Sequence, residues 1–154
     1  MESLLEHVLL SVHVLASIVL IGGSAVATSL FPKYAPVVVA AGTEPSPERN
    51  AATAAAMHRI TGGYAVAGLI VPVIGIVLAA IQGRIGEIWI TIAIALTTLA
   101  GGLLGLFIHP AQREALREPD DGTRLRTLSM TAGIYNLLWA IVVVLMIVRP
   151  GSST

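Results

Sequence analysis

The sequence predicts an all-α membrane protein in which four transmembrane helices form an up-down bundle within a single domain. Three observations predict this fold class. The chain has 154 residues, of which 55% are hydrophobic, and a mean hydropathy of +0.85, whereas soluble domains are roughly 45–50% apolar. The apolar residues gather in four runs, and each run could cross about 30 Å of hydrocarbon as a helix. These runs are residues 8–30, 60–81, 88–108 and 128–148.

Composition and charge exclude several classes of function. Nine basic and nine acidic residues balance, and because they avoid the long apolar runs, we expect no basic surface for nucleic acid. The absence of cysteine excludes disulfides, thiolate metal sites and cysteine nucleophiles. No HExxH, GxSxG or phosphate-loop motif is present, so the sequence indicates no catalytic residues. A signal peptide begins with basic residues, whereas this chain has Glu2 and Glu6 there. We therefore expect the first helix to be retained in the protein and not cleaved off.

The first span, residues 8–30, is the most polar of the four. Its polar groups recur at helical spacing and therefore share one face, formed by Glu6, His13, Ser17 and Ser24. Phe31-Pro32 predicts the end of this helix. The next apolar run, residues 37–41, is too short to cross a membrane and is expected at the interface or packed in a loop.

The second span, residues 60–81, is preceded by a helix-start signal. Ser46-Pro47 places serine at the cap and proline at the first helical position, and we expect the alanine-rich residues 51–56 to extend the helix. Pro72 removes one helical hydrogen bond and predicts a kink. One face carries small residues and is expected to pack against another helix, through Gly68, Pro72 and Gly75.

The third span, residues 88–108, follows a tight connection, so the second and third spans should form an antiparallel hairpin. Trp89 lies near its start, where interfacial aromatic residues often occur. Regular helical spacing places small and polar residues on one face, and we expect this stripe to contact another helix. The stripe consists of Thr91, Ala95, Thr98, Gly102, Gly105 and His109.

The segment after His109-Pro110 is the most charged part of the chain and predicts a solvated loop, with a turn at Pro119-Asp120-Asp121-Gly122. The loops after the first and third spans contain seven basic residues, against two on the other side. Basic residues favour the cytoplasmic side. We therefore expect a multi-pass protein of the cell inner (plasma) membrane with both termini outside the cytoplasm.

Polar residues inside a span are costly and are candidates for function. His13 could bind haem or a metal, could act as a protonation switch, or could be a neutral imidazole hydrogen-bonded to Asn136 or to a serine on another helix. Tyr135, Asn136 and Ser17 are expected near mid-membrane, where they could line a cofactor pocket with His13 or form an ordinary hydrogen-bond network. His58 and His109 are expected on the same membrane side, where they could form an anionic-ligand or metal site or could simply extend their side chains to the interface.

Several short motifs carry a family resemblance: His13 followed by Gly22-Gly23, Phe31-Pro32, Ile60-Thr61-Gly62-Gly63, Trp89-Ile90, His109-Pro110 and Tyr135-Asn136-Leu137-Leu138-Trp139. Through them the chain resembles small bacterial integral membrane proteins of unknown function, which look like distant relatives of the copper-resistance CopD-like and the HemJ-like four-helix proteins. The HemJ-like oxidases are similar in a first-span histidine but also use an intramembrane lysine, whereas the only lysine here, Lys33, lies outside the predicted spans. A CopD-like copper role implies methionine or histidine clusters on the outer side, where only His7 and His13 occur.

Three hypotheses for function follow. The leading one is a binding or accessory subunit of a larger membrane assembly, or a homo-oligomer, because the small-residue faces can serve more neighbours than one short bundle supplies. The second is a haem- or metal-binding redox protein that uses His13. The third is a small dimeric transporter in which Glu6, the only carboxylate close to the first span, carries a coupling proton.

Overall fold

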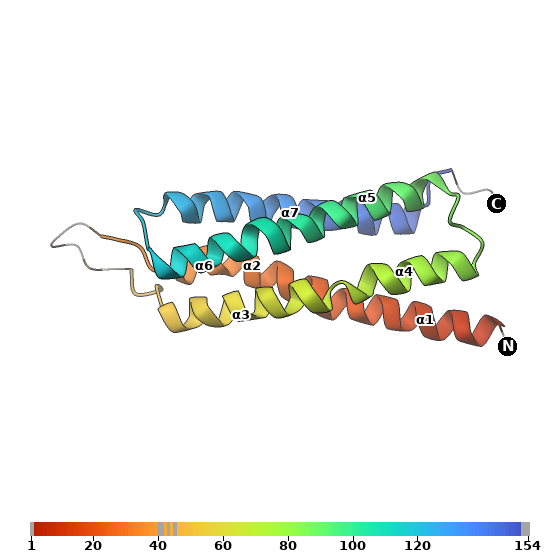
Figure 1. Ribbon diagram of the computed structural model, residues 1–154, viewed down its shortest axis with the longest axis horizontal. Helices are drawn as coiled ribbons and strands as arrows, with labels where there is room; N and C mark the ends of the chain where they lie inside the picture. Colours follow the sequence, from red (N-terminus) through yellow and green to blue (C-terminus); the bar gives the residue numbers. More distant parts are fainter. Residues whose placement is uncertain (1, 40–41, 43, 45, 152–154) are drawn as a thin grey trace.

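In the computed structural model, which describes residues 2–39, 42, 44 and 46–151, four helical rods lie side by side in an up-down bundle (Figure 1). Each rod is long and apolar enough to cross a membrane. The fold class predicted from the sequence is therefore confirmed. The rods extend beyond the predicted apolar runs, to Leu4–Tyr34, Ala51–Ile81, Ile88–Arg117 and Thr123–Val148.

Three of the rods are built from more than one helical segment. The first contains α1 (Glu2–Ala16), the π-helical turn η1 (Ser17–Ile21) and α2 (Gly22–Tyr34). The second contains α3 (Ala51–Ala67) and α4 (Ile70–Ile81). The third contains α5 (Ile88–Gly102), the π-helical turn η2 (Leu103–Ile108) and α6 (His109–Arg117). The fourth is the single helix α7 (Thr123–Val148).

The kink predicted from Pro72 is confirmed. Proline has no N–H to donate to the carbonyl four residues earlier, which belongs to Gly68. The helix is interrupted at that residue and at Leu69, and the Gly68 carbonyl accepts a hydrogen bond from the Val71 N–H instead, at 3.2 Å. The local sequence was sufficient to place this break.

The connection between α2 and α3 corrects two sequence predictions. The first helix does not end at Phe31-Pro32 but continues to Tyr34. The helix start predicted at Ser46-Pro47 is wrong, because α3 begins at Ala51 with Asn50 as its cap, whose side-chain oxygen accepts a hydrogen bond from the Thr53 N–H at 3.0 Å. The Asn50 N–H also donates to the Tyr34 carbonyl at 2.9 Å, so the end of α2 fixes where α3 starts.

The short apolar run after α2 packs against the bundle, as expected for a segment too short to cross a membrane. Val37 contacts the main hydrophobic core. The Val38 N–H donates to the Asp120 carbonyl at 2.9 Å and so links this segment to the turn before α7. Residues 40 and 41 of the run lie outside the described residues.

The solvated loop predicted after Pro110 is mostly helix. Pro110 lies at the start of α6, directly after η2, where its missing N–H is tolerated. The helix then runs to Arg117 because Gln112 and Ala115 are buried in the bundle. Only the predicted turn remains before α7, with Gly122 at a φ of 95° and the Asp120 carboxylate accepting the Gly122 and Arg124 N–H groups at 2.9 and 3.0 Å.

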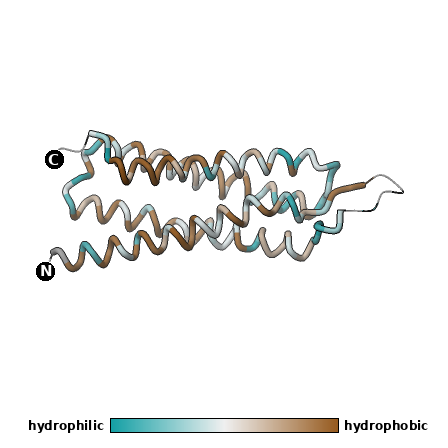
Figure 2. Tube along the Cα trace, turned by 180° about the vertical axis from the view of Figure 1, so that it is seen from behind, coloured by the Kyte–Doolittle hydropathy of each residue, from teal (hydrophilic) through white to brown (hydrophobic). Residues whose placement is uncertain are grey.

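The first two rods form one helical hairpin and the last two form another, and the hairpins are joined chiefly at the end with the α2–α3 and α6–α7 connections, the loop end. There, α2 contacts α7, and α3 contacts α6. The main core lies in this half, around Phe31, Leu104, Ile108, Leu128 and Tyr135. At the opposite end, where Figure 1 shows both termini, a smaller cluster contains Ala79, Trp89 and Ile90. Figure 2 shows hydrophilic positions near the loop end and in the connection between α4 and α5.

The small-residue stripe predicted on the third span is not a helix contact among the described residues at Thr98, Gly102 or Gly105, although its last member, His109, contacts α3. Thr98 is exposed, and no atom from outside the helix's own backbone lies within 4 Å of a Cβ built at Gly102 or Gly105. The buried face of α5 is instead apolar and contains Trp89, Ile90, Ala93 and Ala100. On the second span, Gly75 does contact another helix, whereas a Cβ at Gly68 would meet only the Tyr64 backbone of the same rod.

Candidate functional site: a paired-histidine cluster

Two histidines from different rods stack at the loop end of the bundle. His58 lies in α3 and His109 begins α6. Their ring centroids are 4.3 Å apart, and their planes differ by 14°. The sequence predicted that both residues lie on the same membrane side, and the structure brings them into direct contact.

The contact depends on a glycine that the sequence analysis did not assign to the site. Gly62 lies one turn after His58, and a Cβ atom at this position would come within 2.7 Å of His109 Nε2. A side chain there would displace the imidazole. The Gly62-Gly63 pair was the available signal, because adjacent glycines in an apolar helix permit close packing.

The π-helical turn η2 sets the direction of His109. A π-helix has more residues per turn than an α-helix, so over Leu103–Ile108 the phase falls behind a regular helix by about 100°, roughly the angle of one residue. This explains why the predicted stripe is divided. Thr98 faces outward, whereas His109 turns inward onto His58.

Gln112 completes the cluster. It is fully buried one turn after His109, and its Oε1 lies 3.4 Å from His58 Nδ1. Its Nε2 makes no hydrogen bond with the described residues. An amide can both donate and accept, so it serves either tautomer of His58. We refer to His58, His109 and Gln112 as the paired-histidine cluster.

The cluster lies at the edge of the hydrocarbon layer. If the hydrocarbon begins at Ile88, its thickness of about 30 Å is crossed after about 20 residues of helix, close to His109. The positive charge of Arg113 acts on both rings. We expect at most one of the two stacked rings to be protonated to imidazolium at a time, because two imidazolium cations at this distance would repel.

The stacked geometry is not suited to a metal ion shared by the two rings. Ring nitrogens bind metals in the plane of the imidazole, and in two nearly parallel rings these directions do not converge on one point. A shared metal would require one ring to rotate. Among the described residues there is no group of three or more histidine, aspartate or glutamate side chains that could hold a metal ion.

His13 forms a separate site on α1. Its Nδ1 lies 3.1 Å from the Val71 carbonyl oxygen, and the ring lies against Gly75, where a Cβ would come within 2.9 Å of Cε1. Because a carbonyl can only accept, Nδ1 carries the proton and Nε2 keeps a lone pair. The expected partner, Asn136 or a serine, is therefore wrong. The partner is the backbone beside the Pro72 kink.

The cofactor pocket hypothesised from His13, Ser17, Tyr135 and Asn136 is not formed as one site. The Ser17 hydroxyl donates to the His13 carbonyl at 2.7 Å. Tyr135 instead hydrogen-bonds Ser24 at 2.7 Å, and Ser24 lies about 16 Å along the rod from His13, at 1.5 Å per residue. Asn136 Nδ2 donates to the Ser29 hydroxyl at 2.9 Å, farther along still. Tyr135 and Asn136 thus each make an interhelical hydrogen bond to the first rod, whereas the Ser17 hydroxyl bonds within its own rod.

Comparisons of the chain with protein-family models, with curated proteins and with solved structures found no match.

Proposed function

We propose that the protein is a binding or accessory subunit of a larger membrane assembly, or a homo-oligomer, in which α5 contacts a further helix. The observation that supports this is the outward face of α5. Thr91, Ala95 and Thr98 are exposed there, and Gly102 is only half-buried. Residues 91–105 give this face a length of about 21 Å at 1.5 Å per residue.

Such a face suits another helix better than it suits acyl chains. Small residues let two backbones approach closely, and van der Waals packing is a main force of helix association in lipid. Many outward side chains of the other rods are large and aliphatic, such as Leu15, Val66 and Ile147, which are 62%, 73% and 75% exposed. The α5 face therefore stands out as the candidate interface.

The absence of cysteine makes a direct test practical. In a Thr98→Cys variant, we expect oxidation in the native membrane to give a disulfide-linked dimer if two copies meet through α5. Ile70→Cys is the matched control, because Ile70 is 53% exposed on α4. Both positions lie about 15 Å along their rods from the end of the bundle that carries the chain termini. Mass spectrometry of particles extracted with their lipid would identify any other subunit.

Two results together would reject the proposal. One is crosslinking at Thr98→Cys no greater than at Ile70→Cys. The other is a particle that contains a single copy of the chain and no further polypeptide after gentle extraction.

The orientation is also proposed. Figure 1 shows both termini at one end of the bundle and the α2–α3 and α6–α7 connections at the other. Since seven of the nine basic residues belong to the loop end, we propose that this end is cytoplasmic, in the inner membrane of the cell. A cysteine-reactive, membrane-impermeant label should react with Ser46→Cys only after the membrane is opened, and with Gly151→Cys in intact cells.

A second candidate function is haem or metal ligation by His13. The supporting observation is the Nδ1 contact with the Val71 carbonyl, because a hydrogen bond of this kind orients a histidine ligand and leaves Nε2 for the metal. The bound group would supply redox chemistry, in line with the implied HemJ-like resemblance. Membranes from haem-supplemented cells should then show a Soret band that His13→Leu removes and His109→Leu retains. A colourless wild-type preparation would reject this candidate.

A further inference from the structure

An open groove runs along α6 at the loop end of the bundle. Its apolar end is lined by Leu106, Phe107, Pro110 and Ala111, and its charged rim by Arg113, Glu114 and Arg117. The groove has a volume of about 410 Å³. It adjoins a second depression, of about 380 Å³, between α6 and the start of α7, with which it shares Phe107 and Glu114. We refer to the first of these as the α6 groove.

The arginines of the α6 groove are free to bind an anion. Glu114 is engaged by Arg124, whose Nε lies 3.9 Å from the carboxylate. Asp120 is engaged by backbone N–H groups. Among the described residues, neither Arg113 nor Arg117 forms an ion pair, and both are exposed. They lie four residues apart, so one turn of α6 presents two guanidinium groups together.

The depth of the two arginines matches that of phospholipid headgroups. Counting from Ile88, the hydrocarbon layer of about 30 Å ends near Phe107, and Arg113 lies about 8 Å farther along the helix. Leu106 and Phe107, which are 84% and 46% exposed, thus remain at the level of the acyl chains. The α6 groove passes from an apolar end to a cationic rim at the boundary where a phospholipid makes the same change.

We propose that the α6 groove binds one anionic phospholipid. Its phosphodiester is held by the guanidinium groups of Arg113 and Arg117, since arginine pairs well with phosphate oxygens. One acyl chain lies on Leu106, Phe107 and Pro110. Basic pockets at the membrane boundary are suited to anionic headgroups in this way. Glu114 on the rim opposes the phosphate charge, and its contact with Arg124 reduces that repulsion.

The test is lipid binding to the purified full chain in neutral detergent, followed by native mass spectrometry. The probes are palmitoyl-oleoyl phosphatidylglycerol and the phosphatidylcholine with the same chains. We expect tighter binding of phosphatidylglycerol, and the variant Arg113→Gln/Arg117→Gln should weaken it by about 25-fold, since each arginine near a membrane surface contributes roughly fivefold. Phosphatidylcholine binding should change little.

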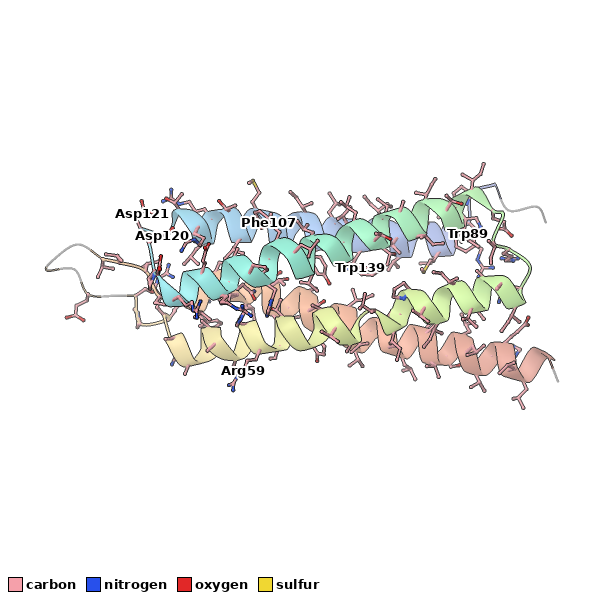
Figure 3. The ribbon with its side chains drawn as sticks, viewed as in Figure 1. Arg59, Trp89, Phe107, Asp120, Asp121 and Trp139 are labelled. Carbon is pink, nitrogen blue, oxygen red and sulfur yellow. The ribbon has the colours of Figure 1, made fainter. Side chains whose placement is uncertain are left out.

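Two further variants separate this role from a structural one. Arg59→Gln/Arg126→Gln removes the same total charge from the loop end, and Figure 3 shows Arg59 pointing away from the bundle. This control should change phosphatidylglycerol binding less than twofold. Glu114→Gln should strengthen the binding severalfold, an effect that loss of folding cannot produce.

The proposal fails if the two double variants weaken phosphatidylglycerol binding equally, or if the wild-type chain does not prefer phosphatidylglycerol. It also fails if millimolar inorganic phosphate competes fully with the lipid, because the groove would then be a phosphate site without a need for the acyl chain.

Discussion

Gly62 lies beneath the imidazole of His109, so closely that a Cβ atom at position 62 would come 2.7 Å from Nε2. The neighbouring Gly63 has open space at the same point, with nothing within 4 Å. Two adjacent glycines of one helix therefore differ in what a methyl group would meet. This difference allows the paired-histidine cluster to be tested with matched variants.

We predict that Gly62→Ala lowers the free energy of unfolding by about 1–3 kcal/mol, because the added methyl group displaces a ring held by its stack on His58. Gly63→Ala should be neutral or stabilising by about 0.5–1 kcal/mol, since alanine favours a helix over glycine. Thermal unfolding in detergent measures both. Addition of His109→Ala to Gly62→Ala should relieve part of the loss. Equal effects of the two glycine variants would contradict the packing described here.

The hydrogen bond between Ser24 and Tyr135 predicts an asymmetric pair of variants. The Ser24 hydroxyl donates to the Ile21 carbonyl at 2.8 Å, so the Tyr135 O–H must donate to Ser24. Tyr135→Phe removes this donor and should cost about 0.5–1 kcal/mol. Ser24→Ala leaves a buried phenol O–H without an acceptor and should cost more, about 1–3 kcal/mol.

Denaturant unfolding in micelles would compare these two variants, with Ser11→Ala as the control because Ser11 is exposed and its hydroxyl bonds only within its own helix. A Tyr135→Phe variant less stable than Ser24→Ala would show that the donor assignment is wrong.

Asp120 is predicted to stabilise the start of α7. Its carboxylate accepts two backbone N–H groups, and its own carbonyl accepts the Val38 N–H. Asp120→Ala should lower the free energy of unfolding by about 1–2 kcal/mol, as the loss of a helix cap does. The exposed neighbour Glu118 offers a control, and Glu118→Ala should change stability by less than about 0.5 kcal/mol. Thermal unfolding of both variants gives the comparison.

Asp121 predicts a pH effect in the same turn. The Thr123 hydroxyl, at 2.7 Å, and then the Thr123 N–H, at 3.1 Å, donate to its carboxylate and hold the pKa of Asp121 below its ordinary value. A lowered pKa means that the ionised form stabilises the fold above about pH 3.9, and that this contribution is lost as the pH falls through the folded-state pKa. The carboxyl carbon should therefore titrate below about pH 3.9 in micelles by NMR. Thr123→Ala should raise that midpoint.

The sequence was sufficient where a structural feature depends on nearby residues. The four spans follow from the apolar runs, the break at Gly68 follows from Pro72, and the turn at Gly122 follows from its composition. The sequence was insufficient where the outcome depends on tertiary contacts. Asn50 and not Ser46 is the helix cap because the Asn50 N–H also bonds the end of α2, and α6 forms because Gln112 and Ala115 are buried.

The site was predicted in part for the same reason. The location of His58 and His109 at the same end of the bundle follows from the up-down order of the helices. That order could be predicted because polar connections separate the apolar runs. Gln112 and the recess at Gly62 depend on how α3 and α6 meet, and no local pattern gives that. The prediction of one continuous face on the third span assumed a regular α-helix throughout, whereas η2 changes the angular position of the residues that follow it, beginning with His109.

A consequence of η2 concerns insertions and deletions. In a regular helix, removing one residue changes both the length and the angular position of everything that follows. Within Leu103–Ile108, a one-residue deletion that restored α-helical geometry would instead leave His109 facing His58, because the missing residue offsets the lag of about 100°. Restoring α-helical geometry with all six residues kept would rotate the end of the rod by about 100°, taking His109 off His58 and turning Arg113 and Arg117 toward a different neighbour. The helical geometry of this single turn thus determines which surface of the loop end faces the lipid.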